Sequence, residues 1–189
     1  MRSWSFLRLM PHDLDDDLNI VISKRLWLIS LVVFALVVII SMTVNQGGVT
    51  LGIPEHQAAP SAERVDEIQT QWRDGGVRNL AIFAMVCDLA WIWIYALGGF
   101  QIGKGFATYC RGILRLLGLG ICAAALVFAV TDYTETTLQL IQLLQDAGND
   151  QMARIASTMR PVKVVAFLAV FAGVTSAWSI DRFANRPST

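Results

Sequence analysis

Four long runs of apolar residues constrain this chain more than any other feature. They cover residues 26–44, 77–100, 113–131 and 162–180. At 1.5 Å per residue, the first run spans roughly 28 Å as a helix, close to the ~30 Å hydrocarbon core of a bilayer. Only 16% of the residues are charged, whereas soluble domains carry about 25%. We therefore expect an all-α integral membrane protein, folded as a four-helix transmembrane bundle.

The bundle, residues 26–180, is expected between an N-terminal segment, 1–25, and a C-terminal tail, 181–189. No small-residue cleavage site follows the first run, which indicates a retained anchor rather than a cleaved signal. Four spans put both ends on one side, and most basic residues beside the spans fall there: Lys24, Arg25, Lys104, Arg111, Arg115 and Arg182. The positive-inside rule predicts that this side, with both termini, is cytoplasmic.

Both outer connections carry amphipathic patterns. Val65, Ile68 and Trp72 recur at helical spacing after Ser61, a favourable N-cap. Residues 136–145 read as a possible continuation of the third span, and the stretch after them repeats the apolar stripe with Met152, Ile155 and Met159. We expect short amphipathic helices that cap the outer mouth of the bundle, or alternatively form a lid for a ligand or partner. Pro161 is expected in the first turn of the fourth helix.

Small residues predict how the spans pack. Lipid is as apolar as leucine, so membrane helices associate where small side chains allow close approach. The third and fourth spans each have such a set: Gly118, Gly120 and Ala124, and Ala169, Gly173 and Ala177. The first span is apolar nearly all round, so we expect it at the periphery, against lipid or a partner.

Asp88 is the sharpest polar feature, because it lies within the second apolar run. An ionised carboxylate at such depth costs at least about 2.5–3.5 kcal/mol, so we expect it to face the bundle interior. Two interpretations stay open. Asp88 is either a group that handles protons, cations or a substrate, or a hydrogen-bonded structural link between helices.

A second polar set is predicted at the outer rim. Asp132 and Glu135 lie three residues apart, hence on one helical face. Lys163 and Arg78 open the fourth and second spans at the same level. We expect these four side chains to form an ion-pair cluster. As acid–base carboxylates they lack a nucleophile or metal-ligating companions, so no catalytic residue is predicted.

The remaining composition excludes several classes of chemistry. Fifteen basic and fifteen acidic residues give a formal net charge of zero, which disfavours nucleic-acid binding. The three cysteines form no C-x-x-C pair, and both histidines lie outside the spans, so intramembrane thiol or haem chemistry is disfavoured. The acidic stretch from Asp13 to Asp17 has Leu18 where a calcium loop needs glycine. No metal or cofactor is predicted.

Several segments together resemble a family of uncharacterised bacterial four-helix inner-membrane proteins. They are ERVDEIQTQW with its W-x-x-x-G loop, CDLAWIWIYAL, TDYTETTLQLIQLL and MRPVKVVAFLAV. The family positions fall on Trp72, Asp88, Tyr95, Asp132, Glu135 and Lys163. Thr136 departs from the pattern, since the family has asparagine there. The resemblance covers about residues 61–170 and implies a single four-helix module in a bacterial inner membrane, with no established activity.

Three functions are compatible with this sequence. The first is a non-catalytic accessory or structural subunit that associates with other membrane subunits. The second is a small oligomeric transporter, or a protein that handles protons or ions through Asp88. The third is an outer-face enzyme that acts on lipid-like substrates through Asp132 and Glu135. The sequence favours the first, and it favours a protein that is not an enzyme.

Overall fold

The computed structural model describes residues 14–46 and 48–184, and side chains from residue 25 to residue 182 apart from residue 47. The N-terminal and C-terminal predictions for residues 1–13 and 185–189 lie outside this part. The described part holds six helices: α1 (Leu14–Thr43), α2 (Ile53–Ala58), α3 (Ala62–Asp74), α4 (Arg78–Tyr109), α5 (Ile113–Gln145) and α6 (Asp150–Ala184). Four of them are long and apolar enough to cross a membrane. The predicted all-α transmembrane bundle is confirmed, and the chain is a multi-pass membrane protein.

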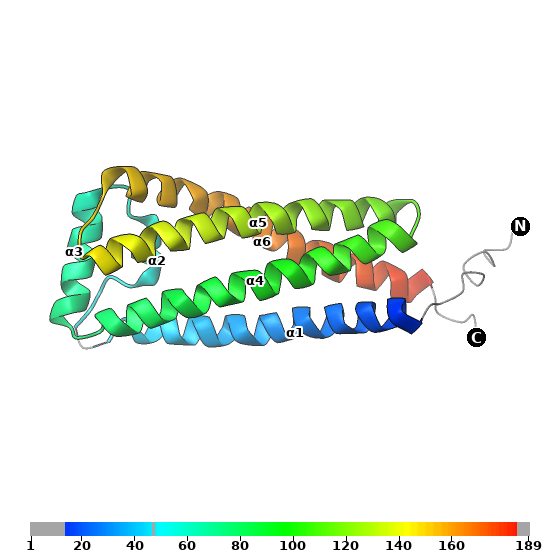
Figure 1. Ribbon diagram of the computed structural model, residues 1–189, viewed down its shortest axis with the longest axis horizontal. Coiled ribbons are helices and arrows are strands. Elements are labelled where there is room, and N and C mark those ends of the chain that lie inside the picture. Colours follow the sequence, from blue (N-terminus) through cyan, green and yellow to red (C-terminus); the bar gives the residue numbers. More distant parts are fainter. Residues whose placement is uncertain (1–13, 47, 185–189) are drawn as a thin grey trace, which may run out of the picture.

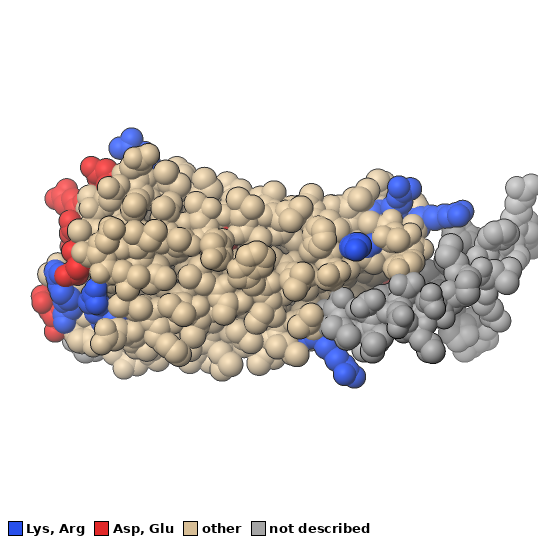
Figure 2. Space-filling view, in the orientation of Figure 1, with Lys and Arg blue, Asp and Glu red and all other residues tan. Residues whose placement is uncertain are grey.

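The four long helices run side by side, and α2 and α3 lie across one end, which we call the capped end (Figure 1). Helix α4 packs against α1 and α5, and α5 packs against α6. Charged side chains gather at the two ends of the bundle and leave the surface between them uncharged in the view of Figure 2. This distribution fits a bilayer around the middle of the bundle.

Two of the long helices extend well beyond the apolar runs. Helix α5 continues past residue 131 to Gln145, and α6 begins at Asp150 rather than near residue 162. Pro161 therefore lies inside α6, contrary to the prediction that it opens this helix. The early start has a local cause. Asn149 Oδ1 accepts a hydrogen bond from Met152 N at 3.0 Å, and Ala153 and Ala156 are buried.

The capped end is held by side-chain to backbone hydrogen bonds. Trp72 Nε1 donates to the carbonyl oxygen of Leu51 at 2.6 Å, and Ala62 N donates to Asp150 Oδ1 at 2.7 Å. The predicted stripe of Val65, Ile68 and Trp72 is buried beneath α3. The amphipathic helix expected over residues 61–72 is confirmed, whereas the second one expected in the outer loops is the beginning of α6.

Small residues make some of the expected helix contacts but not all. A Cβ at Gly118 would lie 2.6 Å from Gly103 O, and one at Gly173 would lie 2.7 Å from Ile121 Cγ1. Ala177 is buried and Ala124 packs against the core. Contrary to the prediction, a Cβ at Gly120 would meet nothing within 4 Å, and Ala169 is exposed.

These two residues face outward because the contacting rows of α5 and α6 lie on another face of each helix. In α5 the row is Gly118, Ile121, Ala125 and Phe128, and in α6 it is Ala166, Val170, Val174 and Ala177. Gly120 and Ala169 therefore border a shallow outer groove between the two helices.

Candidate functional site

An ion cluster of Asp132, Glu135 and Lys163 lies between α5 and α6. Lys163 Nζ is 2.8 Å from Asp132 Oδ1 and 3.0 Å from Glu135 Oε2. Helical spacing puts the two carboxylates on one face of α5, opposite the single ammonium of α6. The exposed fractions are 2%, 0% and 9%, so this cluster lies inside the bundle rather than at its outer rim.

Arg78, predicted as the fourth member, lies elsewhere. Its Nη2 donates to the carbonyl oxygen of Leu143 at 2.7 Å, and its Nε lies 3.8 Å from Asp146 Oδ1. The reason is the length of α5, which continues about 12 Å beyond Glu135 before it reaches Leu143. Arg78 therefore links α4 to the capped end of the bundle.

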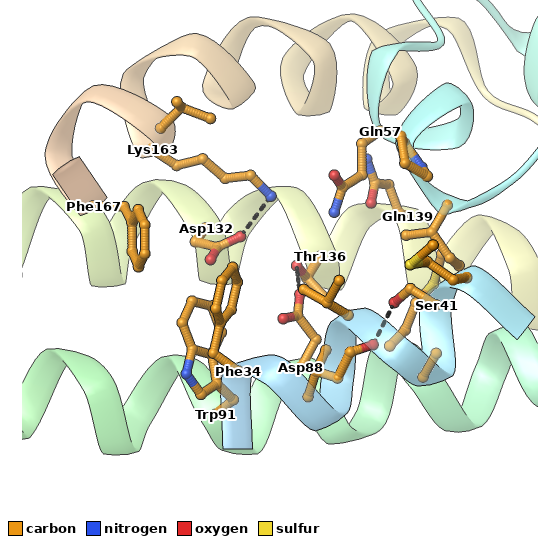
Figure 3. A pocket seen from close by; sticks show the side chains of 18 of the residues that line it. Phe34, Ser41, Gln57, Asp88, Trp91, Asp132, Thr136, Gln139, Lys163 and Phe167 are labelled. Atoms are coloured by element: carbon orange, nitrogen blue, oxygen red, sulfur yellow. Dashed lines mark hydrogen bonds and ion pairs between the residues drawn. The ribbon is translucent and has the colours of Figure 1, made fainter. Parts of the chain in front are cut away.

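Asp88 lies beside the ion cluster, on α4. Thr136 Oγ1 donates to Asp88 Oδ2 at 3.2 Å, and this is the one hydrogen bond to Asp88 within the described residues. Thr136 follows Asp132 by one helical turn, so α5 presents both residues on the same face. Asp88 and Lys163 reach into one space from opposite walls (Figure 3). The polar layer thus joins α4, α5 and α6.

This space is a cavity of about 310 Å³, lined by residues of α1, α2, α4, α5 and α6. Its polar lining consists of Ser41, Asn45, Gln57, Asp88, Asp132, Thr136, Gln139 and Lys163. On the side away from the cap, it ends at four aromatic rings that we call the aromatic wall: Phe34, Trp91, Phe128 and Phe167. Neighbouring rings of the wall have centroids 4.9 Å to 6.1 Å apart, so the wall is closely packed.

The charges in this layer do not balance. Asp88, Asp132 and Glu135 face one Lys163, so the fully ionised layer carries two negative charges in excess. Burying unpaired charge in a bilayer costs several kcal/mol. Bound protons or a bound cation remove that cost. The arrangement is therefore suited to proton or cation binding.

The structure also adds residues that the sequence did not single out for this site. Thr136 and Gln139 follow Asp132 at helical spacing, so the sequence could have placed them on the same face of the helix. They lie beyond the apolar run, which ends at residue 131. Within the described residues, no group of three His, Cys, Asp or Glu side chains is arranged to hold a metal ion.

No family model, curated protein or solved structure matches the chain. The resemblance to bacterial four-helix inner-membrane proteins therefore stays a prediction. The geometry of the cavity and its polar layer is the basis for any functional conclusion.

Proposed function

We propose that this protein binds a proton or a cation at Asp88 inside the membrane and exchanges it with water, as a small transporter or proton-handling protein. The observation that carries the proposal is the Asp88 carboxylate in a cavity that Asp132 and Lys163 also line, with Glu135 paired to the same lysine, so that three buried acids share one base. A purely structural carboxylate would have no need of an adjacent cavity. Exchange needs one, because the bound proton or cation must enter and leave.

Access from water is available on the side of the cap. Asn45 lines the cavity and is exposed at the capped end, and Gln57 of α2 and Gln139 of α5 extend the polar lining in that direction. The aromatic wall closes the other side. A binding site that water reaches from only one face of the membrane is typical of one state of a carrier rather than of an open pore.

An accessory role remains the second candidate, and the surface of α1 supports it. Only 17% of the apolar window of this helix is buried within the chain. The remaining surface is free for lipid, a second copy or another membrane subunit, as the sequence predicts. This role does not explain why Asp88 adjoins a cavity, so we rank it second.

We place the protein in a bacterial inner membrane with its termini in the cytoplasm. Basic residues beside the helix ends opposite the cap support this orientation: Lys104, Arg111, Arg115 and Arg182. In a variant without native cysteines, a membrane-impermeant thiol reagent applied outside should label Asp74→Cys and not Arg111→Cys. The reverse pattern would invert the orientation.

The proposal is tested by proton movement in liposomes. The purified protein is reconstituted with a trapped pH-sensitive dye, and a potassium diffusion potential drives proton entry. We expect protein-dependent acidification that is lost in Asp88→Asn and retained in Asp74→Asn, an exposed carboxylate of α3 that serves as the matched control. Equal fluxes for the wild type and a correctly assembled Asp88→Asn protein would refute the proposal.

A further inference from the structure

The cavity has an opening toward the lipid. Val38 and Met42 of α1 and Val164 of α6 line it, yet their exposed fractions are 38%, 70% and 45%. A residue that both lines a cavity and is exposed outside it marks the edge of an opening. These three residues, which we call the rim, lie on membrane-spanning helices and are all apolar. The opening therefore faces the hydrocarbon of the bilayer.

Ring contacts seal α1 to α6 on the side away from the cap. The centroids of Phe34 and Phe167 are 5.4 Å apart, and those of Trp27 and Phe171 are 5.7 Å apart. Beyond Phe34, toward the capped end, Val37, Val38 and Ser41 line the cavity. The gap between α1 and α6 on this side is therefore the lateral route into the polar layer.

The polar groups of the cavity that remain available to a ligand are hydrogen-bond acceptors. Lys163 is engaged by two carboxylates, whereas Asp88 receives one hydrogen bond among the described residues. Gln139 is 2% exposed and lines the cavity, and its Oε1 has no hydrogen-bond partner in the described part of the chain. A matching ligand offers positive charge or hydrogen-bond donors.

The aromatic wall gives further information on the chemical class of the ligand. Aromatic faces attract cations, and desolvated cation–π contacts contribute about 2 kcal/mol or more. Trp91 and Phe34 line the same cavity as Asp88, with ring centroids 4.9 Å apart. A carboxylate beside aromatic rings is suited to an alkylammonium head, and an apolar rim is suited to a hydrocarbon chain.

We infer that the cavity takes an amphiphilic organic ammonium cation that enters from the bilayer between α1 and α6. Its charged head would lie by Asp88 and the aromatic wall, and its chain would leave past the rim. This inference rests on the proposed function, because the cation and the proton compete for Asp88. Charge balance then requires that binding the cation to protonated Asp88 releases one proton.

The test uses the full chain in lipid nanodiscs with dodecyltrimethylammonium as the probe. We expect saturable binding above that of empty nanodiscs, with proton release, and none with dodecanol, which has the same chain without charge. Asp88→Asn should weaken binding about tenfold or more, because a buried charge partner is lost. Asp74→Asn should bind as the wild type does. Phe34→Leu serves as a second variant, expected to weaken binding several-fold if Asp88→Asn does not assemble.

The route is tested at two adjacent valines of α6. Val164 belongs to the rim, whereas Val165 is exposed but does not line the cavity. Val164→Trp should slow association of the probe at least about tenfold, because the tryptophan narrows the opening, and Val165→Trp should leave the rate unchanged. Equal rates in these two variants would overturn the lateral route.

The two proposals fail in different ways. Binding that is equal in wild type, Asp88→Asn and Phe34→Leu would overturn the organic-cation assignment. If Asp88-dependent proton flux is still present, the proposed function stands with another ligand. If that flux is also absent, both proposals are wrong.

Discussion

Thr136 donates its hydroxyl hydrogen to Asp88 across the contact between α4 and α5, with 3.2 Å between Thr136 Oγ1 and Asp88 Oδ2. A hydroxyl can donate to a carboxylate and can accept from a carboxylic acid. Thr136 is therefore able to position Asp88 in either protonation state.

Removal of that hydroxyl should impair the site more than the fold. Thr136→Val keeps the shape of the side chain, and we expect it to lower the free energy of unfolding by about 1 kcal/mol and to slow proton flux. The matched control is Thr134→Val, because Thr134 is less buried and, among the described residues, bonds within its own helix alone, to Val130 O at 2.7 Å. Thermal unfolding and the liposome assay measure both effects. Equal losses in the two variants would contradict a positioning role for Thr136.

Lys163 should be essential for stability because it pairs with two buried carboxylates. Lys163→Met leaves both carboxylates unpaired, and we expect a loss of about 3–5 kcal/mol. Adding Asp132→Asn and Glu135→Gln removes the unpaired charges and should restore much of the unfolding temperature in detergent. If the triple variant is no more stable than Lys163→Met, charge pairing is not what the cluster contributes.

Two glycines of α5, two residues apart, should respond in opposite ways to alanine. A Cβ at Gly118 would come within 2.6 Å of Gly103 O, whereas one at Gly120 meets nothing within 4 Å. Gly118→Ala should cost about 1–3 kcal/mol through overpacking, and Gly120→Ala should be neutral or slightly stabilising. Unfolding temperatures of the two variants in one detergent measure the difference. A similar cost at both positions would count against the packing of α4 on α5.

The capped end should be sensitive to acid through His56. This residue is buried, and Gln69 Nε2 lies 3.4 Å from its Nε2, so burial lowers the pKa of His56 from 6.5 to about 4. The unfolded chain takes up a proton below pH 6.5 and the folded chain only near pH 4, so stability falls as the pH drops between these values. The full loss is about 3 kcal/mol.

A variant isolates this contribution from the other titrating groups. His56→Gln should have a flatter dependence of unfolding temperature on pH between 7 and 4 than the wild type, as measured in detergent. Identical pH profiles for the two proteins would show that His56 does not control the stability of the cap.

The spans and most of the ion cluster were predictable because they depend on local signals. Continuous apolar runs identify the helices, and the spacing of Asp132 and Glu135 places both carboxylates on one face. The continuation of α5 to Gln145 was one of the open interpretations of the sequence, whereas the early beginning of α6 was not predicted. Gln139 and Gln142 are polar, so the apolar run ends before them, yet the bundle buries both. The position of Arg78 was predicted wrongly because α5 continues beyond the apolar run, and Arg78 contacts that continuation at Leu143.

The cavity itself could not be predicted from the sequence. It depends on how α1 and α6 separate beyond the contact between Phe34 and Phe167, and that separation is a property of the assembled bundle. The same holds for Trp93, which lies in the second apolar run and is exposed on the outer surface beside Tyr133. The contacting face of each helix depends on all of its neighbours.

The central claim is that Asp88 exchanges a proton inside the membrane, and infrared difference spectroscopy of the reconstituted protein tests it most directly. A pH titration follows the C=O stretch of a protonated carboxyl group, which an ionised carboxylate lacks. We predict a band that titrates in the wild type and in Asp74→Asn and is missing in Asp88→Asn. A titration spectrum that Asp88→Asn leaves unchanged would contradict the account.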